Sequence, residues 1–186
     1  MKCSIAVLGV IFLIAGLTGC ATSPQVIKVP PTVVVGRPAS LDFILVTTTN
    51  TLPDVQAETA LLQDSILSGL RQTSLFPNID TVAPKETPAA GIQITASITQ
   101  ITKVSNSARA WYGGLAGKAQ VVALVKISDL ASHQPIEEFG VEGHTGASAR
   151  SGLTDEAVQL AAAQVVDEIK HLDAQAAQFE LEHGTR

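Results

Sequence analysis

The sequence predicts an α+β domain of two layers, in which two long helices cover one face of a mostly antiparallel sheet. Apolar residues recur at the helical period in two segments, 54–72 and 154–179, whereas the segments around them alternate apolar with polar residues as strands do. The order strand, helix, several strands, helix is typical of helices gathered on one side of a sheet. We expect a single domain over residues 41–180, followed by a tail at 181–186.

The first strand and the first long helix are expected over residues 41–48 and 54–72. The strand is apolar on both faces, which indicates a central position in the sheet. Asp54 follows a proline and is expected to cap the first turn of the helix. The core stripe of this helix comprises Ala57, Ala60, Leu61, Ile66, Leu67 and Leu70. A weak strand at 79–82 is expected to return to the sheet through a parallel crossover.

Residues 91–104 form the clearest predicted strand. The apolar residues that alternate there with polar neighbours are Ile92, Ile94, Ala96 and Ile98. One face of the strand is therefore expected to lie in the core and the other in water. Ile101 is out of phase with this alternation, which predicts a bulge near Thr99 and Gln100.

A hairpin and the second long helix complete the predicted domain. Residues 115–130 alternate again, and 136–141 form the returning strand after a turn that begins at Asp129. Thr154 starts the last helix, with two acidic residues in the first turn to complement the helix dipole. If it runs to residue 179 the helix is ~39 Å long, enough to cross the whole sheet.

The amino-terminal segment indicates a lipid-anchored protein. The apolar run at 5–17 follows Lys2 and spans 13 residues, fewer than the ~20 of a helix that crosses a bilayer. It ends in Leu17-Thr18-Gly19-Cys20, which resembles the bacterial lipobox. The resemblance implies a signal peptide over residues 1–19, diacylglycerol on the Cys20 thiol, and an acyl chain such as palmitate on its amine. The alternatives are an ordinary secretory signal and an uncleaved anchor.

Ala21, rather than Asp, follows the predicted lipid site. By resemblance to Gram-negative sorting signals, this residue favours the outer membrane, with the domain on the periplasmic face. Residues 20–40 contain four prolines and are expected to form a tether that reaches at most ~65 Å. The segment Val33-Val34-Val35 is apolar for a tether, so a short strand at a sheet edge is left open there.

The composition of the mature chain excludes several kinds of chemistry and of partner. Because Cys3 leaves with the signal and Cys20 carries lipid, the mature chain of 167 residues has no thiol for a disulfide, a nucleophile or a metal site. Its formal charge becomes −6 on loss of Lys2, and its Lys and Arg residues form no cluster. Nucleic acid is therefore not an expected partner.

We expect no enzymatic activity, no cofactor and no metal site. No two of the four His residues have the i, i+4 spacing of a helical metal site. The turn at Asp129 explains that carboxylate without catalysis, and the adjacent Glu137 and Glu138 should point to opposite faces of a strand. The Gly-rich segment 143–146 lacks the serine of a hydrolase elbow.

The candidate contact site lies in the connection between the two long predicted strands. It comprises Arg109, Trp111, Tyr112, Gly113, Gly114 and Gly117. The single Trp and single Tyr of the chain are adjacent there, and these residue types are enriched at interface hot spots. A phosphate-binding loop is excluded because Tyr112 takes the place of its first glycine and Ala119 that of its hydroxyl residue. The alternatives are glycines that permit a tight connection and aromatics that cap the core.

Several short motifs resemble an uncharacterised bacterial lipoprotein family, a domain of unknown function. They are Arg37-Pro38, Ile44-Leu45-Val46, Gly91-Ile92, Arg109 with the three glycines that follow it, Ile127-Ser128-Asp129 and Pro135-Ile136. The resemblance covers residues 37–169. The order of elements is more distantly similar to the TolB amino-terminal, CsgG and LpoB domains of the periplasm. These resemblances imply work in envelope assembly or with a protein partner.

Two functions from different classes follow. The first is a non-enzymatic outer-membrane lipoprotein whose domain binds an envelope protein or forms a homo-oligomer, through a sheet edge or the segment 109–117. The second is a periplasmic small-ligand-binding or enzymatic domain whose pocket the sequence does not disclose. The first explains both the lipid anchor and the lack of a catalytic set, so it is the function that we expect.

Overall fold

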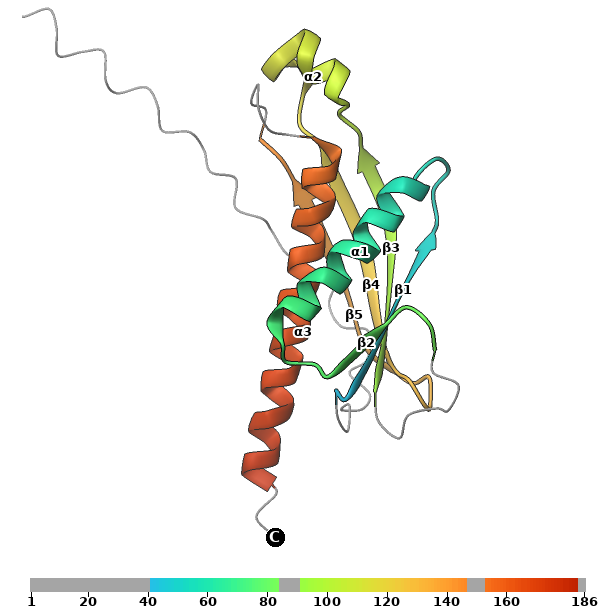
Figure 1. Ribbon diagram of the computed structural model, residues 1–186, viewed down its shortest axis with the longest axis vertical. Helices are drawn as coiled ribbons and strands as arrows, with labels where there is room; N and C mark the ends of the chain where they lie inside the picture. Colours follow the sequence, from blue (N-terminus) through green and yellow to red (C-terminus); the bar gives the residue numbers. More distant parts are fainter. Residues whose placement is uncertain (1–40, 84–90, 147–152, 184–186) are drawn as a thin grey trace, which may run out of the picture.

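A five-stranded mixed sheet forms one layer of the molecule, and two long helices form the other (Figure 1). The computed structural model describes residues 41–83, 91–146 and 153–183. The strands are β1 (Phe43–Asn50), β2 (Asn78–Asp80), β3 (Ile92–Thr102), β4 (Gln120–Asp129) and β5 (Pro135–His144). The helices are α1 (Gln56–Thr73), α2 (Asn106–Tyr112), the 3₁₀ turn η1 (Gly113–Ala116) and α3 (Thr154–His183). The α+β class is thus confirmed, whereas the predicted signal peptide, Cys20 and the tether with Val33 to Val35 lie outside the described residues.

The strand order is β2-β1-β3-β4-β5. β1 runs parallel to both β2 and β3, and the pairs β3–β4 and β4–β5 are antiparallel. The parallel crossover from β1 through α1 to β2 is as predicted, and β1 lies inside the sheet as its two apolar faces indicate. The sheet is more evenly mixed than expected, because β1 is parallel to its neighbours on both sides.

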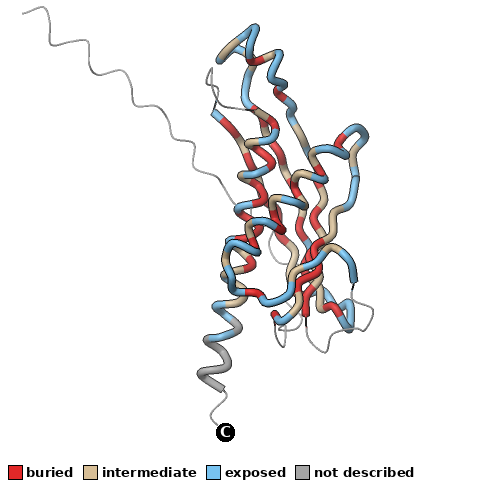
Figure 2. Tube along the Cα trace, in the orientation of Figure 1, coloured by how far each residue is buried: buried red, intermediate tan, exposed pale blue. Residues whose placement is uncertain are grey.

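The core lies between the sheet and the helices α1 and α3, as the red buried segments of Figure 2 show. On β3 the residues Ile92, Ile94, Ala96 and Ile98 are fully buried, while the polar residues between them are partly exposed. The register shifts between Ile98 and Gln100, so the predicted bulge is confirmed. The buried stripe of α3 comprises Ala157, Val158, Ala161, Ala162, Val165, Val166 and Ile169.

The start of α1 differs from the sequence prediction, whereas α3 begins at Thr154 as expected. Asp54 does not cap α1: Val55 holds the N-cap position without a side-chain hydrogen bond. Asp54 has a φ of 55°, and its carbonyl accepts a hydrogen bond from Nζ of Lys103 at 2.5 Å. Thr154 is the first helical residue of α3, and its Oγ1 accepts from the N–H of Val104 at 2.9 Å. It also donates to the Val104 carbonyl at 3.3 Å, so this threonine joins α3 to the segment that follows β3.

α3 packs directly against β5 at Gly143. A Cβ atom at this position would lie 1.9 Å from the Ala157 carbonyl oxygen and 2.7 Å from the Ala161 nitrogen. Only a glycine therefore lets the helix backbone approach the strand so closely. Within the parts of the chain that the structure describes, no helix has the length and apolar character needed to cross a membrane.

Candidate interaction surface

The connection between β3 and β4 forms a helical projection at one end of the molecule (Figure 1). We call α2 and η1, residues 106–116, the tip. Ser105 caps α2, because its Oγ accepts a hydrogen bond from the N–H of Ala108 at 3.1 Å. The sequence predicted a tight Gly-rich connection here and a strand from residue 115, but a short helix and a 3₁₀ turn form and β4 begins only at Gln120. Gly117, at a φ of 88°, ends the tip in a conformation that side chains disfavour.

Arg109 holds the tip together from inside. Its side chain is buried, with 6% exposed. Nη1 donates to the carbonyl of Gly113 at 3.1 Å, and Nη2 donates to the carbonyl of Gly117 at 2.9 Å. These charge-assisted hydrogen bonds join α2 to both ends of η1. Arg109 is therefore a positioning residue rather than a residue that a partner contacts directly.

Three large apolar side chains extend from the tip into solvent. Trp111 is 84% exposed, Tyr112 67% and Leu115 93%. The two aromatic rings therefore do not cap the core, which was the alternative that the sequence left open. Gly113 has a φ of 52° and turns the chain from α2 into η1, while Gly114 lies exposed within η1. Leu115 belongs to the same exposed set and was missed, although a leucine in a Gly-rich connection was a usable signal.

The sheet edges offer less for assembly than the tip. At the β5 edge, the side-chain amide of Gln164 on α3 pairs with the backbone of Glu142. Its Oε1 accepts from the Glu142 N–H at 3.2 Å, and its Nε2 donates to the Glu142 carbonyl at 2.8 Å. The amide thus occupies backbone groups that a further strand would need. The opposite edge strand, β2, has only three residues.

The absence of a catalytic or metal site stays a prediction from the sequence. Within 41–83, 91–146 and 153–183, no group of three or more His, Cys, Asp or Glu could hold a metal ion. Asp129 accepts hydrogen bonds at Oδ1 from the backbone and the hydroxyl of Ser132, each at 2.7 Å, and from the N–H of Ala131 at 3.1 Å. These bonds, chiefly the backbone one, lower the pKa of Asp129 and fix the turn before β5. Asp129 is a turn residue, as the sequence indicated.

The other candidate acids and bases are spread over the molecule. Glu137 lies opposite Ile127 and Glu138 opposite Lys126, so the two carboxylates occupy opposite faces of the sheet as predicted. His133 lies exposed in the β4–β5 turn. Nδ1 of His144 is 3.8 Å from Oε1 of Glu142, an acceptor that also receives a hydrogen bond from Nε2 of Gln120.

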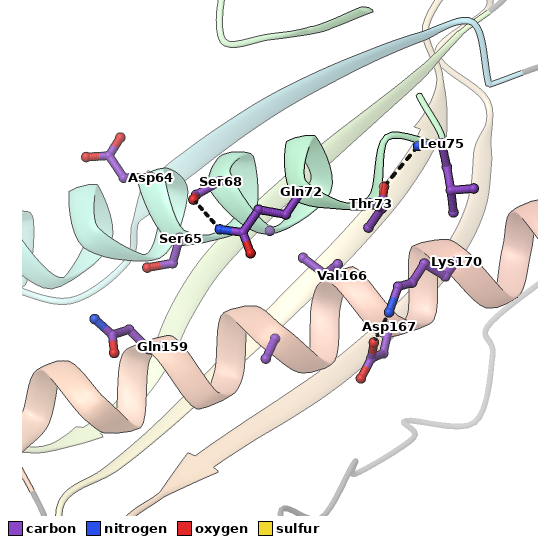
Figure 3. A pocket seen from close by; sticks show the side chains of 12 residues that line it. Asp64, Ser65, Ser68, Gln72, Thr73, Leu75, Gln159, Val166, Asp167 and Lys170 are labelled. Carbon is purple, nitrogen blue, oxygen red and sulfur yellow. Dashed lines mark hydrogen bonds and ion pairs between the residues drawn. The ribbon is translucent and has the colours of Figure 1, made fainter. Parts of the chain in front are cut away.

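An open groove of about 840 Å³ lies between α1 and α3, on the side of the helix layer away from the sheet (Figure 3). Ser65 of α1 and Gln159 and Val166 of α3 lie between the two helices there. A Cβ atom at Gly69 would lie 2.7 Å from Cγ2 of Val166, so the helices touch at this point. No pattern in the sequence indicates this groove, because its shape depends on how the two helices cross.

Comparison with solved structures identifies proteins of the same architecture. A PelC dodecamer from Paraburkholderia phytofirmans matches with a TM-score of 0.50 at 16% identity, covering 77% of this chain and 95% of that one. A DUF330 protein from Xanthomonas campestris matches with a TM-score of 0.52 at 11% identity, covering 80% and 97%. The chain shares its fold with these two proteins. No protein-family model and no curated protein matches the sequence.

At these identities the likeness concerns the fold alone. It agrees with the resemblance to a family of unknown function, since DUF330 is such a family. Neither structure supports the more distant comparison with the TolB, CsgG and LpoB domains, which stays an expectation from the sequence. The role of the chain must therefore be argued from its own surface.

Proposed function

We propose that this chain is a non-enzymatic lipoprotein of the bacterial envelope that works through protein contacts made by its tip. The observation that carries the proposal is the exposure of Trp111, Tyr112 and Leu115 on a projection that Arg109 braces. Trp and Tyr bury ~150–250 Å² each, so an exposed pair represents a large unused binding area. Clustered large apolar side chains on a soluble surface mark interaction sites more often than isolated ones do.

The internal hydrogen bonds of the tip support the same role. A preorganised contact loses less conformational entropy on binding than a flexible loop does. The hydrogen bonds from Arg109 and the Ser105 cap hold the exposed side chains in one arrangement before any partner arrives. The partner is a second copy of the chain or another envelope protein. The PelC structure of similar fold is a dodecamer, which favours homo-oligomerisation.

The location follows from the amino-terminal segment. Cys20 is the proposed lipid site, and Ala21 favours the outer membrane with the domain on the periplasmic side. Several acyl chains on one residue make a lasting anchor, because each buried methylene contributes ~0.8 kcal/mol. The tether at 20–40 then holds the domain near the membrane. Replacing Cys20 by Ser tests the anchor: unchanged processing and membrane retention would refute lipidation.

The tip is tested in whole cells by chemical cross-linking of the envelope. The variant Trp111→Ser with Leu115→Ser removes the apolar contact while leaving Arg109 in place. The matched control is Val82→Ser, because Val82 is 68% exposed and lies outside the tip. We expect the tip variant to lose its cross-linked protein adducts and the control to keep them. Equal adducts in both variants would overturn the tip as the contact site, and a small molecule bound without any protein adduct would favour the ligand-binding alternative.

A further inference from the structure

An exposed positive charge lies next to the tip of this acidic protein. Residues 105–118 contain Arg109 and Lys118 and no acidic residue, whereas the whole chain has a formal charge of −5. Lys118 is exposed and lies two residues after the tip. A matching surface would therefore be hollow, partly apolar and acidic at its rim.

The groove between α1 and α3 has these three properties. Its volume of about 840 Å³ lies in the range of ~300–1,000 Å³ that holds sizeable ligands. Small side chains line much of it, which leaves room for an incoming aromatic ring: Ser65, Ser68, Gly69 and Ala163. Val166 lies at its floor, where the two helices touch.

The rim of the groove is acidic overall. Asp64 on α1 and Asp167 on α3 bring two carboxylates, and Lys170 brings one ammonium group. Nζ of Lys170 lies 2.6 Å from Oδ1 of Asp167, so these two charges offset each other. The remaining carboxylate of Asp64 leaves a net charge of −1, opposite in sign to Lys118 next to the tip.

We propose that this groove receives the tip of a second copy of the chain. The inference rests on the proposed function, since it names the partner that the tip contacts. The tip lies at one end of the molecule, whereas the groove lies along the carboxyl-terminal half of α1 and the middle of α3 (Figures 1 and 3). Two different surfaces therefore meet in each contact. Such heterologous contacts build closed rings or filaments rather than two-fold dimers.

The tip supplies the central part of this interface. Trp111 and Tyr112 together bury ~300–500 Å², against the ~800 Å² per partner of a standard protein interface. The remaining area comes from Leu115, from Lys118 and from the backbone around them. Loss of an aromatic side chain at the centre should therefore weaken the assembly far more than loss of a rim charge.

Site-specific photo-cross-linking in intact cells tests the inference. Leu115 is replaced by a photo-reactive phenylalanine analogue in the full-length chain, and the adducts are purified and mapped by peptide mass spectrometry. We expect adducts between two copies, with the cross-linked peptides at residues 64–75 or 159–170. A reciprocal probe at Ala163, which is exposed in the groove, is expected to capture peptides from the tip.

A blocking variant provides the control. Ala163→Phe fills the groove and should lower the yield of the adduct between copies about tenfold or more. Ala174→Phe places the same ring at an exposed position farther along α3 and should leave the yield unchanged. Charge reversal by Asp64→Lys or by Lys118→Glu should each lower the yield about two- to fivefold, and combining them should restore most of it.

The outcomes separate this inference from the proposed function. Adducts only with another envelope protein, or between copies but outside the groove, would overturn the tip-in-groove contact and leave the tip as a contact site. Capture of the chain's own residues 33–35 by the probe at Ala163 would assign the groove to the tether and overturn the inference as well. Absence of any protein adduct at position 115 would overturn both proposals.

Discussion

Replacing Gly143 by Ala should separate α3 from the sheet. The added Cβ would lie 1.9 Å from the Ala157 carbonyl oxygen and 2.7 Å from the Ala161 nitrogen. Both are helix backbone atoms, so no change of rotamer can relieve the clash. The helix or the edge strand must therefore move away as a unit.

The size of the effect follows from this displacement. Ordinary van der Waals contact begins near 3.4 Å, so the helix must withdraw by about 1.5 Å at this point. A gap of ~0.5–1 Å already forfeits a quarter to a half of the dispersion energy between facing atoms. The buried stripe of α3 supplies much of the core, and overpacking alone typically costs 1–3 kcal/mol. We expect a loss of about 3 kcal/mol or more, which corresponds to a fall in Tm of roughly 10 °C.

Urea unfolding of the purified protein, followed by far-UV circular dichroism, measures this loss. Gly146→Ala is the matched control, because a Cβ there meets nothing within 4 Å and should change stability by less than ~0.5 kcal/mol. Gly113→Ala separates packing from backbone strain, since it has free space but a φ of 52° and should cost ~1–3 kcal/mol. Equal stability of the Gly143 and Gly146 variants would refute the close contact of α3 with β5.

Three further changes test other contacts. Thr154→Val leaves the buried N–H and carbonyl of Val104 without the threonine hydroxyl and should cost about 1–3 kcal/mol in urea unfolding, whereas Thr154→Ser should recover most of it. Gln164→Ala uncovers the β5 edge at Glu142 and should raise the rate of concentration-dependent aggregation measured by light scattering. Asp129→Asn should destabilise the protein at pH 7; because hydrogen bonding lowers the pKa of Asp129 in the folded state, its contribution is present above the unfolded pKa of about 3.9 and is lost as the pH falls through the lower folded-state pKa. The urea midpoints of the two proteins should therefore converge as the pH falls below the unfolded pKa, and a difference independent of pH would contradict the role of the charge.

The hydrophobic periodicity of the sequence predicted the strands and helices that have one buried face and one exposed face. β3 has a buried face and a wet face, so its alternation identified the strand, its core residues and even the bulge after Ile98. α1 and α3 each bury one stripe, and both helices were expected within a few residues of their observed ends. The predicted stripe of α1 was wrong in its first turns, where Ala57 and Ala60 are exposed and Leu62 is buried. The start of β4 was placed at Leu115 in error, because an alternating pattern cannot show that Gly117 interrupts it with a positive φ.

Strand pairing could not be predicted in the same way. The sequence of β1 shows that both its faces are apolar, but not that it lies parallel to two neighbours. Parallel or antiparallel pairing depends on the path of the connections, which periodicity does not record. The capping of α1 failed for a related reason: Asp54 has a residue type suited to a cap, but its backbone adopts a φ of 55° and its carbonyl accepts from Lys103.

The composition of the chain identified the candidate site, and the structure corrected the role of Arg109 within it. Trp111 and Tyr112 were identified because the single Trp and Tyr of the chain are adjacent, and both are exposed. Arg109 was grouped with them, since charge suggests a surface role, but its guanidinium lies inside the tip. Whether an arginine faces a partner or its own backbone depends on carbonyl groups four and eight residues away, which only the folded tip brings together.

Gln164 protects the β5 edge of the sheet from further strand pairing, whereas the tip stays exposed. It lies within the buried stripe of α3, where an amide costs stability unless both its polar atoms are satisfied. Satisfying them on Glu142 also removes a pairing site at the β5 edge. The large apolar side chains of the tip have no comparable cover, although Lys or Glu there would improve solubility. Because the β5 edge is covered and the tip is exposed, we expect assembly through the tip. The photo-cross-linked adducts formed at Leu115 test this expectation directly.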